Sequence, residues 1–238
     1  MSTAMRDGRG APLPTGEDKA TMVRTMFDAI APRYDLVNRV MTFGLDNRWR
    51  HRTVRALGLP AGSVVLDVAC GTGDLSRIAA GHGMRVVGLD LSFGMLRAAP
   101  SGPALVEADA LALPLSDGTV DGLTCGFALR NVTDLAAALG EMARVLRPGG
   151  RLALLEVDEP TGRLMRLGHR IWFERAVPVI GATLSDADAY RYLPRSVAYL
   201  PPPERLRSMV REAGFSTVGR QPLGGGVAQL LTATRSGR

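Results

Sequence analysis

Short apolar runs, glycine turns and helical patterns alternate through the middle of the chain. Helical patterns at 75–83, 93–99 and 135–146 lie between runs with the length and composition of buried strands. These apolar runs cover 64–69, 85–91, 104–110, 121–129 and 151–157. Strands joined through helices pair in parallel with right-handed crossovers. The pattern therefore predicts an α/β fold with an open, doubly wound sheet.

Different patterns flank this core on both sides. Residues 1–18 are polar and rich in Gly and Pro, which predicts a disordered tail. From residue 19 to 61 apolar residues recur at helical spacing, and Pro32 predicts a break near Ala31. At the other end we expect a helix over 204–214 and then a β-hairpin formed by 215–223 and 224–235.

Composition narrows the classes of function. The two cysteines, Cys70 and Cys125, cannot form a disulfide framework and fit a reducing cytoplasm. We find neither a signal peptide nor an apolar run long enough to span a bilayer. The net charge of +6 fits nucleic acid, an anionic membrane or an anionic ligand, and it also fits a GC-rich coding sequence that favours arginine. Aromatic residues make up only 5% of the chain and do not interleave with the arginines, so no nucleic-acid partner is expected.

The stretch VVLDVACGTGDL (64–75) carries the first chemical signal. Gly71 and Gly73 let the backbone pass close beneath a ligand. Asp90 ends the next strand 19 residues after Gly71, the spacing at which an acid commonly binds a ribose hydroxyl. This pattern fits nicotinamide, flavin and S-adenosylmethionine sites.

Further residues favour S-adenosylmethionine. Ser76 stands where a dinucleotide fingerprint has its third glycine, and the acids Asp67 and Asp74 would repel a pyrophosphate but suit a sulfonium-bearing zwitterion. Asp109 can bind an exocyclic amine, and Ala110 leaves room beside the ring. The alternative for Asp67 and Asp109 is that they only cap turns.

The whole arrangement resembles the class I S-adenosylmethionine-dependent methyltransferases. That resemblance implies a seven-stranded Rossmann-like sheet whose last strand is antiparallel. Five segments are similar to the ubiquinone/menaquinone biosynthesis C-methyltransferase family, namely MFDAIAPRYDLVNRVMTFGLDNRW (26–49), GFALRNVTD (126–134), RVLRPGGRLALLEV (144–157), DADAYRYLPRSV (186–197) and GGGVAQL (224–230).

This second resemblance covers nearly all of residues 20–235 and implies a reaction. Members of the family methylate a ring carbon of a polyprenylated hydroquinone, demethylmenaquinol or the ubiquinone-pathway equivalent, with S-adenosylmethionine as donor. The implied donor contacts are Thr72 in the glycine turn, Asp90 at the ribose, Asp109 with Ala110 at the adenine, and Gly126 close to the sulfonium.

The resemblance also implies one methyltransferase domain over 19–238. We divide it into an N-terminal helical cap (19–61), a cofactor-binding core (63–157), a lid insertion on the acceptor side (158–203) and a closing helix and hairpin (204–238).

Transfer of a methyl group to an aromatic carbon needs an electron-rich ring, which a phenol becomes when it loses its proton. Arg130 follows the fourth strand, where its cation can hold a phenolate, and Asn131 can bond the second oxygen. The alternative is that Asn131 or Thr133 caps the next helix. His169, Asp188 and Tyr190 are candidates for the acceptor pocket, against a solvated histidine and an ordered surface loop. No metal is expected.

A basic amphipathic pattern over 163–175 can either lie on an anionic membrane or pack as a lid. A polyprenyl tail requires access to a membrane, so we expect a cytoplasmic protein with peripheral contact at the inner face. The oligomeric state, a homodimer included, is left open.

Departures from the family pattern keep other functions open. Val37, Thr42 and Asp46 replace the usual Met, Ser and His, and Asp158 with Glu159 replaces a Phe-Ser or similar pair. The alternative functions are methylation of a soluble phenolic or natural-product acceptor, and donor binding without activity.

Overall fold

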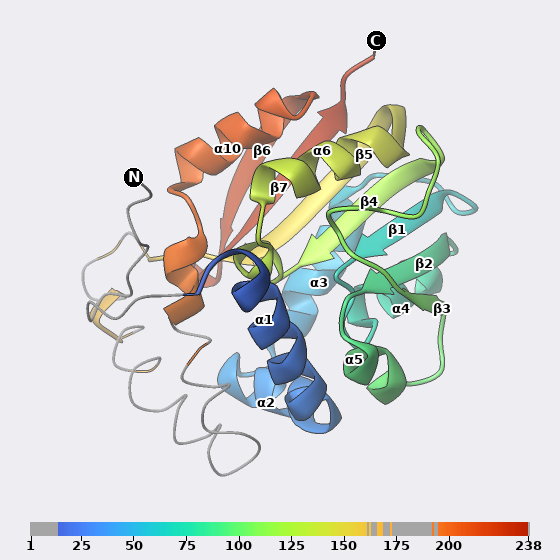
Figure 1. The fold of residues 1–238 in the computed structure, drawn as a ribbon. Helices are drawn as coiled ribbons and strands as arrows, with labels where there is room; N and C mark the ends of the chain where they lie inside the picture. The colour runs from blue at the N-terminus through green and yellow to red at the C-terminus, as the bar shows by residue number, and fades with distance from the viewer. Residues whose placement is uncertain are drawn as a thin grey trace.

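The computed structural model describes residues 14–160, 162, 166–168, 172, 192 and 195–237, and a seven-stranded sheet forms its centre (Figure 1). The strand order is β3-β2-β1-β4-β5-β7-β6. The first five strands pair in parallel, and β7 runs antiparallel to both β5 and β6. The doubly wound sheet and the closing hairpin are therefore confirmed. The strands are β1 Val64–Val68, β2 Arg85–Asp90, β3 Ala104–Glu107, β4 Val120–Gly126, β5 Leu146–Val157, β6 Phe215–Leu223 and β7 Ala228–Arg235.

Strand alternation divides the core between the two faces of the sheet. In β5, Leu152 and Leu154 pack into one cluster, whereas Ala153 and Leu155 pack into another. The first face is covered by α6 (Leu135–Val145) and α10 (Pro203–Glu212), and the second by α3 (Leu45–Ala56) and α4 (Asp74–Gly81) (Figure 1). Because both faces are covered, the parallel strands read as nearly continuous apolar runs in the sequence.

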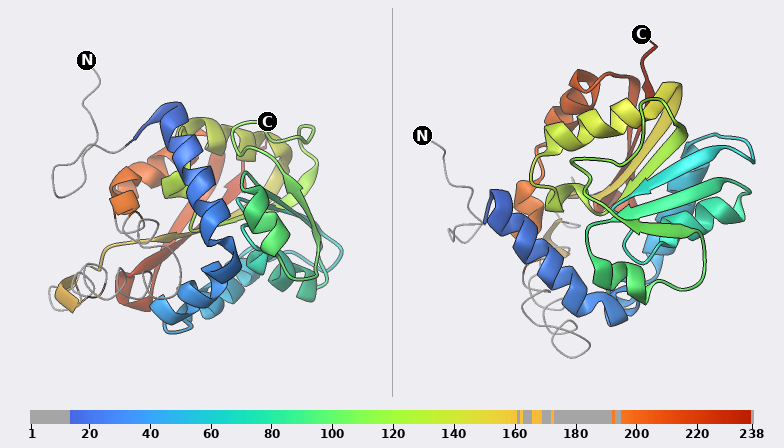
Figure 2. Two further views of the ribbon diagram at one scale, coloured as in Figure 1. Left: turned by 60° about the horizontal axis from the view of Figure 1, so that its bottom comes forward. Right: turned by 45° about the vertical axis from the view of Figure 1, so that its right-hand side comes forward.

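The N-terminal cap consists of α1 (Gly16–Ile30), η1 (Ala31–Arg33) and α2 (Tyr34–Met41). The predicted break at Pro32 is confirmed, because this residue lies in η1 between the two helices. The predicted disordered tail, residues 1–18, extends too far along the chain. The helix α1 already begins at Gly16, with the acids Glu17 and Asp18 in its first turn. Ile30 and Val37 pack with Met95 of α5 (Phe93–Ala98) in a third apolar cluster. Figure 2 shows α1 crossing the end of the sheet to which the parallel strands point.

Three short 3₁₀ turns complete the described elements: η2 (Leu129–Asn131), η4 (Val197–Tyr199) and η5 (Gly224–Gly226). None of the helices in the described part of the chain has the length and apolar character needed to cross a bilayer.

Candidate functional site

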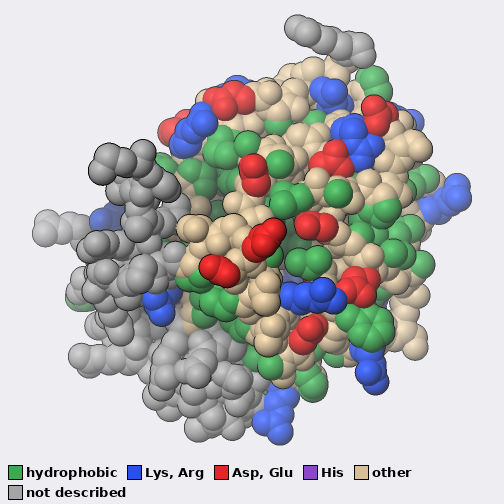
Figure 3. Space-filling view, in the orientation of Figure 1, with side chains coloured by type: hydrophobic (Ala, Val, Ile, Leu, Met, Phe, Trp, Pro, Cys, Tyr) green, Lys and Arg blue, Asp and Glu red, His purple; other side chains and the backbone are tan. Residues whose placement is uncertain are grey.

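A cavity that is partly open to solvent lies where the carboxyl ends of β1, β2 and β4 meet the cap. This is the position at which open α/β sheets bind ligands. Figure 3 shows this face hollowed near its centre, with hydrophobic atoms inside the hollow and acidic side chains around it. The wall contributed by the strand ends consists of Val68, Ala69, Gly71, Leu89, Asp90, Gly126 and Phe127.

The glycine turn after β1 forms one edge of this cavity. Gly71 and Gly73 have φ angles of +58° and +83°, the left-handed region that side chains rarely adopt. Gly73 caps the N-terminus of α4, and its carbonyl accepts the Arg77 amide at 2.9 Å. The turn thus brings the Gly71 backbone to the cavity, whereas Gly73 caps α4 and lies outside the lining.

Asp90 lines the cavity and also anchors two loops. Its carboxylate accepts the Gly71 amide at 2.7 Å and the Ser92 amide at 2.8 Å, one on each oxygen. Burial raises the pKa of Asp90, and the two backbone donors oppose this shift. Each carboxylate oxygen has a second lone pair, so Asp90 can still accept hydrogen bonds from ribose hydroxyls.

Asp109 and Ala110 lie together at the cavity, after β3. Asp109 accepts the Leu111 amide at 2.9 Å and is exposed, so it both caps its turn and faces the opening. The two readings of Asp109 are therefore compatible.

The structure corrects the expected role of Asp67. Its carboxylate is fully buried and accepts the Ser76 and Thr124 hydroxyls at 2.7 and 2.8 Å. Burial raises its pKa to about 6, the two hydroxyl donors opposing the shift. Asp67 does not line the cavity, so it joins β1 to α4 and β4 instead of contacting a ligand.

Thr72 is also turned away from the cavity. Its side chain is buried, and its hydroxyl donates to Asp35 of α2 at 2.8 Å. In place of the contact with S-adenosylmethionine that the family resemblance implies, Thr72 joins the glycine turn to the cap.

The cap supplies an apolar wall that the sequence reasoning missed. Ala20, Val23 and Phe27 of α1 line the cavity together with Tyr34 at the start of α2. Burial raises the pKa of Tyr34, so its phenol stays protonated. Apolar residues recur at helical spacing in this segment, but the same spacing is found in a helix that faces the core and in a helix that covers a cavity. The sequence alone therefore does not distinguish the two positions.

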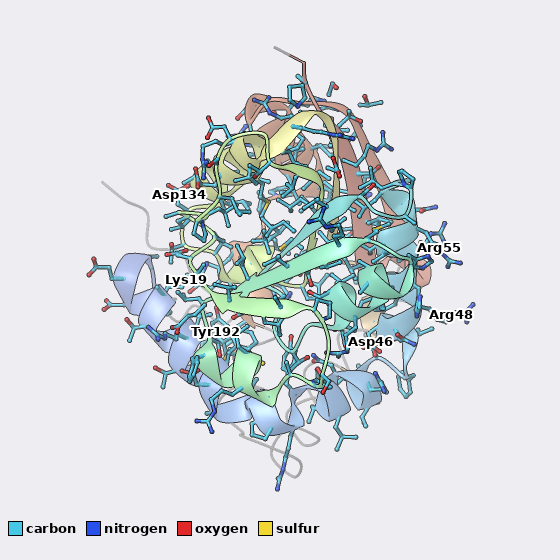
Figure 4. The ribbon with its side chains drawn as sticks, turned by 90° about the vertical axis from the view of Figure 1, so that its right-hand side faces the viewer. Lys19, Asp46, Arg48, Arg55, Asp134 and Tyr192 are labelled. Carbon is cyan, nitrogen blue, oxygen red and sulfur yellow. The ribbon has the colours of Figure 1, made fainter. Side chains whose placement is uncertain are left out.

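Lys19, the single lysine of the chain, fixes the first turns of α1. Its ammonium donates to the Val132 carbonyl at 2.7 Å and lies 3.7 Å from the centre of the Tyr199 ring. Figure 4 shows Lys19 on α1, on the opposite side of the molecule from Arg48 and Arg55 of α3. Val132 itself lines the cavity, so this contact closes the cap over it.

The end of β4 carries the predicted catalytic pair, and the structure separates its two members. Asn131 lines the cavity, and its side-chain oxygen accepts the Tyr192 hydroxyl at 3.4 Å. Arg130 is buried, forms an ion pair with Glu156 and donates to the Ser196 hydroxyl at 3.2 Å. The prediction that Arg130 offers its cation to the acceptor is therefore wrong, because Glu156 neutralises Arg130 and the guanidinium lies outside the cavity lining. Nor does Asn131 or Thr133 cap the next helix, since Asp134 accepts the Ala137 amide in that role.

The unusual acid Asp158 is likewise neutralised, because it forms an ion pair with Arg220 of β6. Glu159 remains exposed. His169, Asp188 and Tyr190 lie outside the described residues, and so does most of the 163–175 segment. Cys125 is buried and Cys70 half-buried, and burial raises the pKa of both thiols. Both therefore stay protonated.

The cavity thus combines two kinds of surface. One end carries the carboxylates Asp90 and Asp109 beside backbone that approaches closely, which suits a nucleoside. The remainder is mostly apolar, with the polar side chains of Tyr34, Asn131 and Thr133 in its wall, which suits a flat, lipophilic molecule with a polar edge.

Comparison with known proteins identifies relatives over almost the whole chain. A sequence model described as the ubiE/COQ5 methyltransferase family matches residues 15–235. A demethylmenaquinone methyltransferase of Roseiflexus castenholzii is 44% identical over 94% of this chain and 98% of its own. A ubiquinone/menaquinone biosynthesis C-methyltransferase of Syntrophotalea carbinolica is 44% identical over 90% of this chain and 94% of its own.

Solved structures support the fold. A methyltransferase of an antibiotic biosynthesis pathway from Anabaena variabilis has a TM-score of 0.60 at 25% identity, covering 74% of this chain and 64% of that one. Phosphoethanolamine N-methyltransferase 2 of Haemonchus contortus, in complex with S-adenosyl-L-methionine, has a TM-score of 0.60 at 14% identity, over 80% of this chain and 53% of that one.

Proposed function

Since the chain belongs to the ubiE/COQ5 methyltransferase family, we propose that it methylates a ring carbon of a demethylmenaquinol-type hydroquinone. S-adenosylmethionine is the methyl donor and S-adenosylhomocysteine the product. The observation that carries the proposal is one cavity in which nucleoside-binding carboxylates and an apolar chamber adjoin.

The donor is proposed to lie along the strand ends. Asp90 accepts its ribose hydroxyls, Asp109 accepts its adenine amine, and Ala110 leaves space for the ring. Gly71 and Gly126 allow the amino-acid part and the sulfonium to lie close to backbone. At Gly126 a methyl group would lie 2.8 Å from Leu75 Cδ1, so the strand end accepts no side chain without displacing its neighbour.

The acceptor ring is proposed to lie in the apolar part, with an oxygen at Asn131. The contact from Tyr192 to the amide oxygen leaves the amide nitrogen to donate to a phenolate. Arg130 then acts as a positioning residue: its backbone amide donates to Glu156 at 3.3 Å and its guanidinium pairs with the same carboxylate, which fixes η2 and with it Asn131. Holding the ring carbon, the methyl group and the sulfur in line is the larger part of the catalysis, up to about 7–11 kcal/mol in ideal cases.

The alternative acceptor, a soluble phenol or natural product, is not favoured. Relatives 42–44% identical over most of the chain carry the name demethylmenaquinone methyltransferase. Of the two acids that suggest a different substrate, Asp158 forms an ion pair with Arg220, and Glu159 is exposed.

Access to a lipid substrate places the protein, in this proposal, in the cytoplasm at the inner face of the membrane. The basic pattern over 163–175 supports such contact. The number of subunits stays open.

The test is a transfer assay with S-adenosylmethionine labelled in its methyl group. Demethylmenaquinol, reduced and dispersed in detergent, is compared with demethylated ubiquinol-type rings and with soluble phenols. We expect label in the ring of a quinol. Donor binding without label in any quinol would contradict the proposal, and label in a soluble phenol alone would favour the alternative.

A further inference from the structure

The helix α2 has two apolar faces, and only one of them serves the fold. Tyr34, Val37 and Met41 lie on the inner face, in the cluster beneath the cap. Leu36 and Val40 lie four residues apart on the opposite face and are 56% and 40% exposed. Nothing in the described chain requires this second face to be apolar. The helix α2 lies at the lower edge of the molecule in Figure 1.

Phe43 extends this apolar face beyond the end of α2. It is 73% exposed and adopts a φ of +54°, a conformation that a bulky side chain rarely takes. Trp172 packs against it at 4.7 Å between ring centres and donates to the Met41 carbonyl at 3.1 Å. A residue from the basic amphipathic segment therefore meets the same surface, with the half-buried Trp172 ring beside the exposed Phe43 ring.

The charges around this face are positive. Arg39 and Arg48 are exposed, and no ion pair with a described acid involves either of them. Both acids of α2 and α3 are turned inward, because Asp35 accepts the Thr72 hydroxyl and Asp46 pairs with Arg50. Exposed apolar side chains on α2, with exposed arginines on α2 and on α3 that follows it, suit an anionic lipid surface.

The same helix reaches the cavity. Tyr34 lines the cavity, and Leu36 lies two residues further along α2 on its outer side. We propose that Leu36, Val40 and Phe43, together with the exposed Arg39 and Arg48, dock the protein on an anionic bilayer and bring the cavity to its lipid substrate. The apolar side chains enter the interface and the guanidinium groups bind lipid phosphates. The purpose of the docking, delivery of a lipid substrate, rests on the proposed function. The test of docking itself, binding to vesicles, does not depend on that function.

The test is co-sedimentation with vesicles of phosphatidylcholine, with and without phosphatidylglycerol. We expect the intact chain to bind phosphatidylglycerol vesicles, less so as salt is raised. The variant Leu36→Gln/Val40→Gln/Phe43→Gln should partition about tenfold more weakly, and Arg39→Gln/Arg48→Gln should lose binding at low salt. The matched control Val106→Gln removes a 44% exposed apolar side chain from the edge strand β3 and should bind as the parent does.

A second readout separates docking from catalysis. Turnover of a long-chain quinol embedded in vesicles should fall in the triple variant, whereas turnover of a short-tailed quinol in solution should not. Failure of the parent chain to bind anionic vesicles, equal binding by the triple variant, or binding only to an acidic protein would overturn the proposal. If no quinol is methylated, the proposed function fails while the vesicle result still decides the docking surface.

Discussion

The pair of Arg130 and Glu156 gives the sharpest test of how the acceptor end is built. Their side chains are 7% and 0% exposed, so removing one partner leaves the other as an uncompensated buried charge. Such a loss costs about 3–5 kcal/mol, whereas replacing both ions by apolar side chains of similar size is often neutral or stabilising. We therefore expect Arg130→Met and Glu156→Leu each to destabilise strongly, and the double variant to recover most of the loss.

Urea unfolding followed by circular dichroism measures these free energies. A single variant should also melt about 6–20 °C lower, at about 2–4 °C per kcal/mol for a chain of this size. The exposed pair of Arg205 and Glu212, 55% and 57% exposed, is the matched control and should change little.

Activity provides the second readout for this pair. In the proposed role of Arg130 as a positioning residue for Asn131, outside the cavity lining, the single variants should lower kcat while the donor Kd stays near its parent value. Losses that simply add in the double variant, or single variants as mild as the control pair, would refute the interpretation of a buried positioning pair.

Three further substitutions test residues that lie outside the cavity lining, in the sheet and in the cap. Burial raises the pKa of Asp67 from 3.8 to about 6, so between these values the folded state holds a proton that the unfolded chain has lost. The resulting stabilisation of the fold is fully present below about pH 4 and is lost as the pH rises through about 6. The variant Asp67→Asn should therefore flatten the pH dependence of the free energy of unfolding in that range. Gly88→Ala should destabilise by about 1–3 kcal/mol in thermal unfolding, because a methyl group there would lie 2.6 Å from Leu105 Cδ2 and 2.8 Å from Cys70 Sγ, and an unchanged midpoint would contradict this. Lys19→Met should weaken donor binding about 3–10-fold in calorimetry, because the cap loses a charge-assisted hydrogen bond. Burial lowers the pKa of Lys19 to about 8, so the parent's donor affinity should fall above pH 8 while that of the variant stays level.

The sheet could be predicted from the sequence because its signals are local. Buried parallel strands require apolar runs, the turn at Gly71 requires glycine, and Pro32 prevents a continuous helix. The placement of Asp90, Asp109 and Gly126 at one cavity followed from the same topology, since the carboxyl ends of adjacent parallel strands meet at one edge of the sheet.

The acceptor end could not be predicted in this way, because its partners lie far apart in the chain. Nothing local in the sequence indicates that Glu156 neutralises Arg130, that Arg220 neutralises Asp158, or that Lys19 reaches Val132. Asp67 was misassigned for a related reason: a polar residue inside a strand looks the same in sequence whether it faces a ligand or two buried hydroxyls.

In the proposed function the donor lies at the strand ends, beneath the cap. A crystal structure of the protein with S-adenosylhomocysteine tests this placement most directly. We expect ribose hydroxyls within hydrogen-bond distance of Asp90, the adenine amine at Asp109 and the sulfur beside Gly126, with the apolar chamber toward Asn131 left for the acceptor. An adenosine group bound away from Asp90 and Asp109, or one that fills the chamber at Asn131, would contradict it.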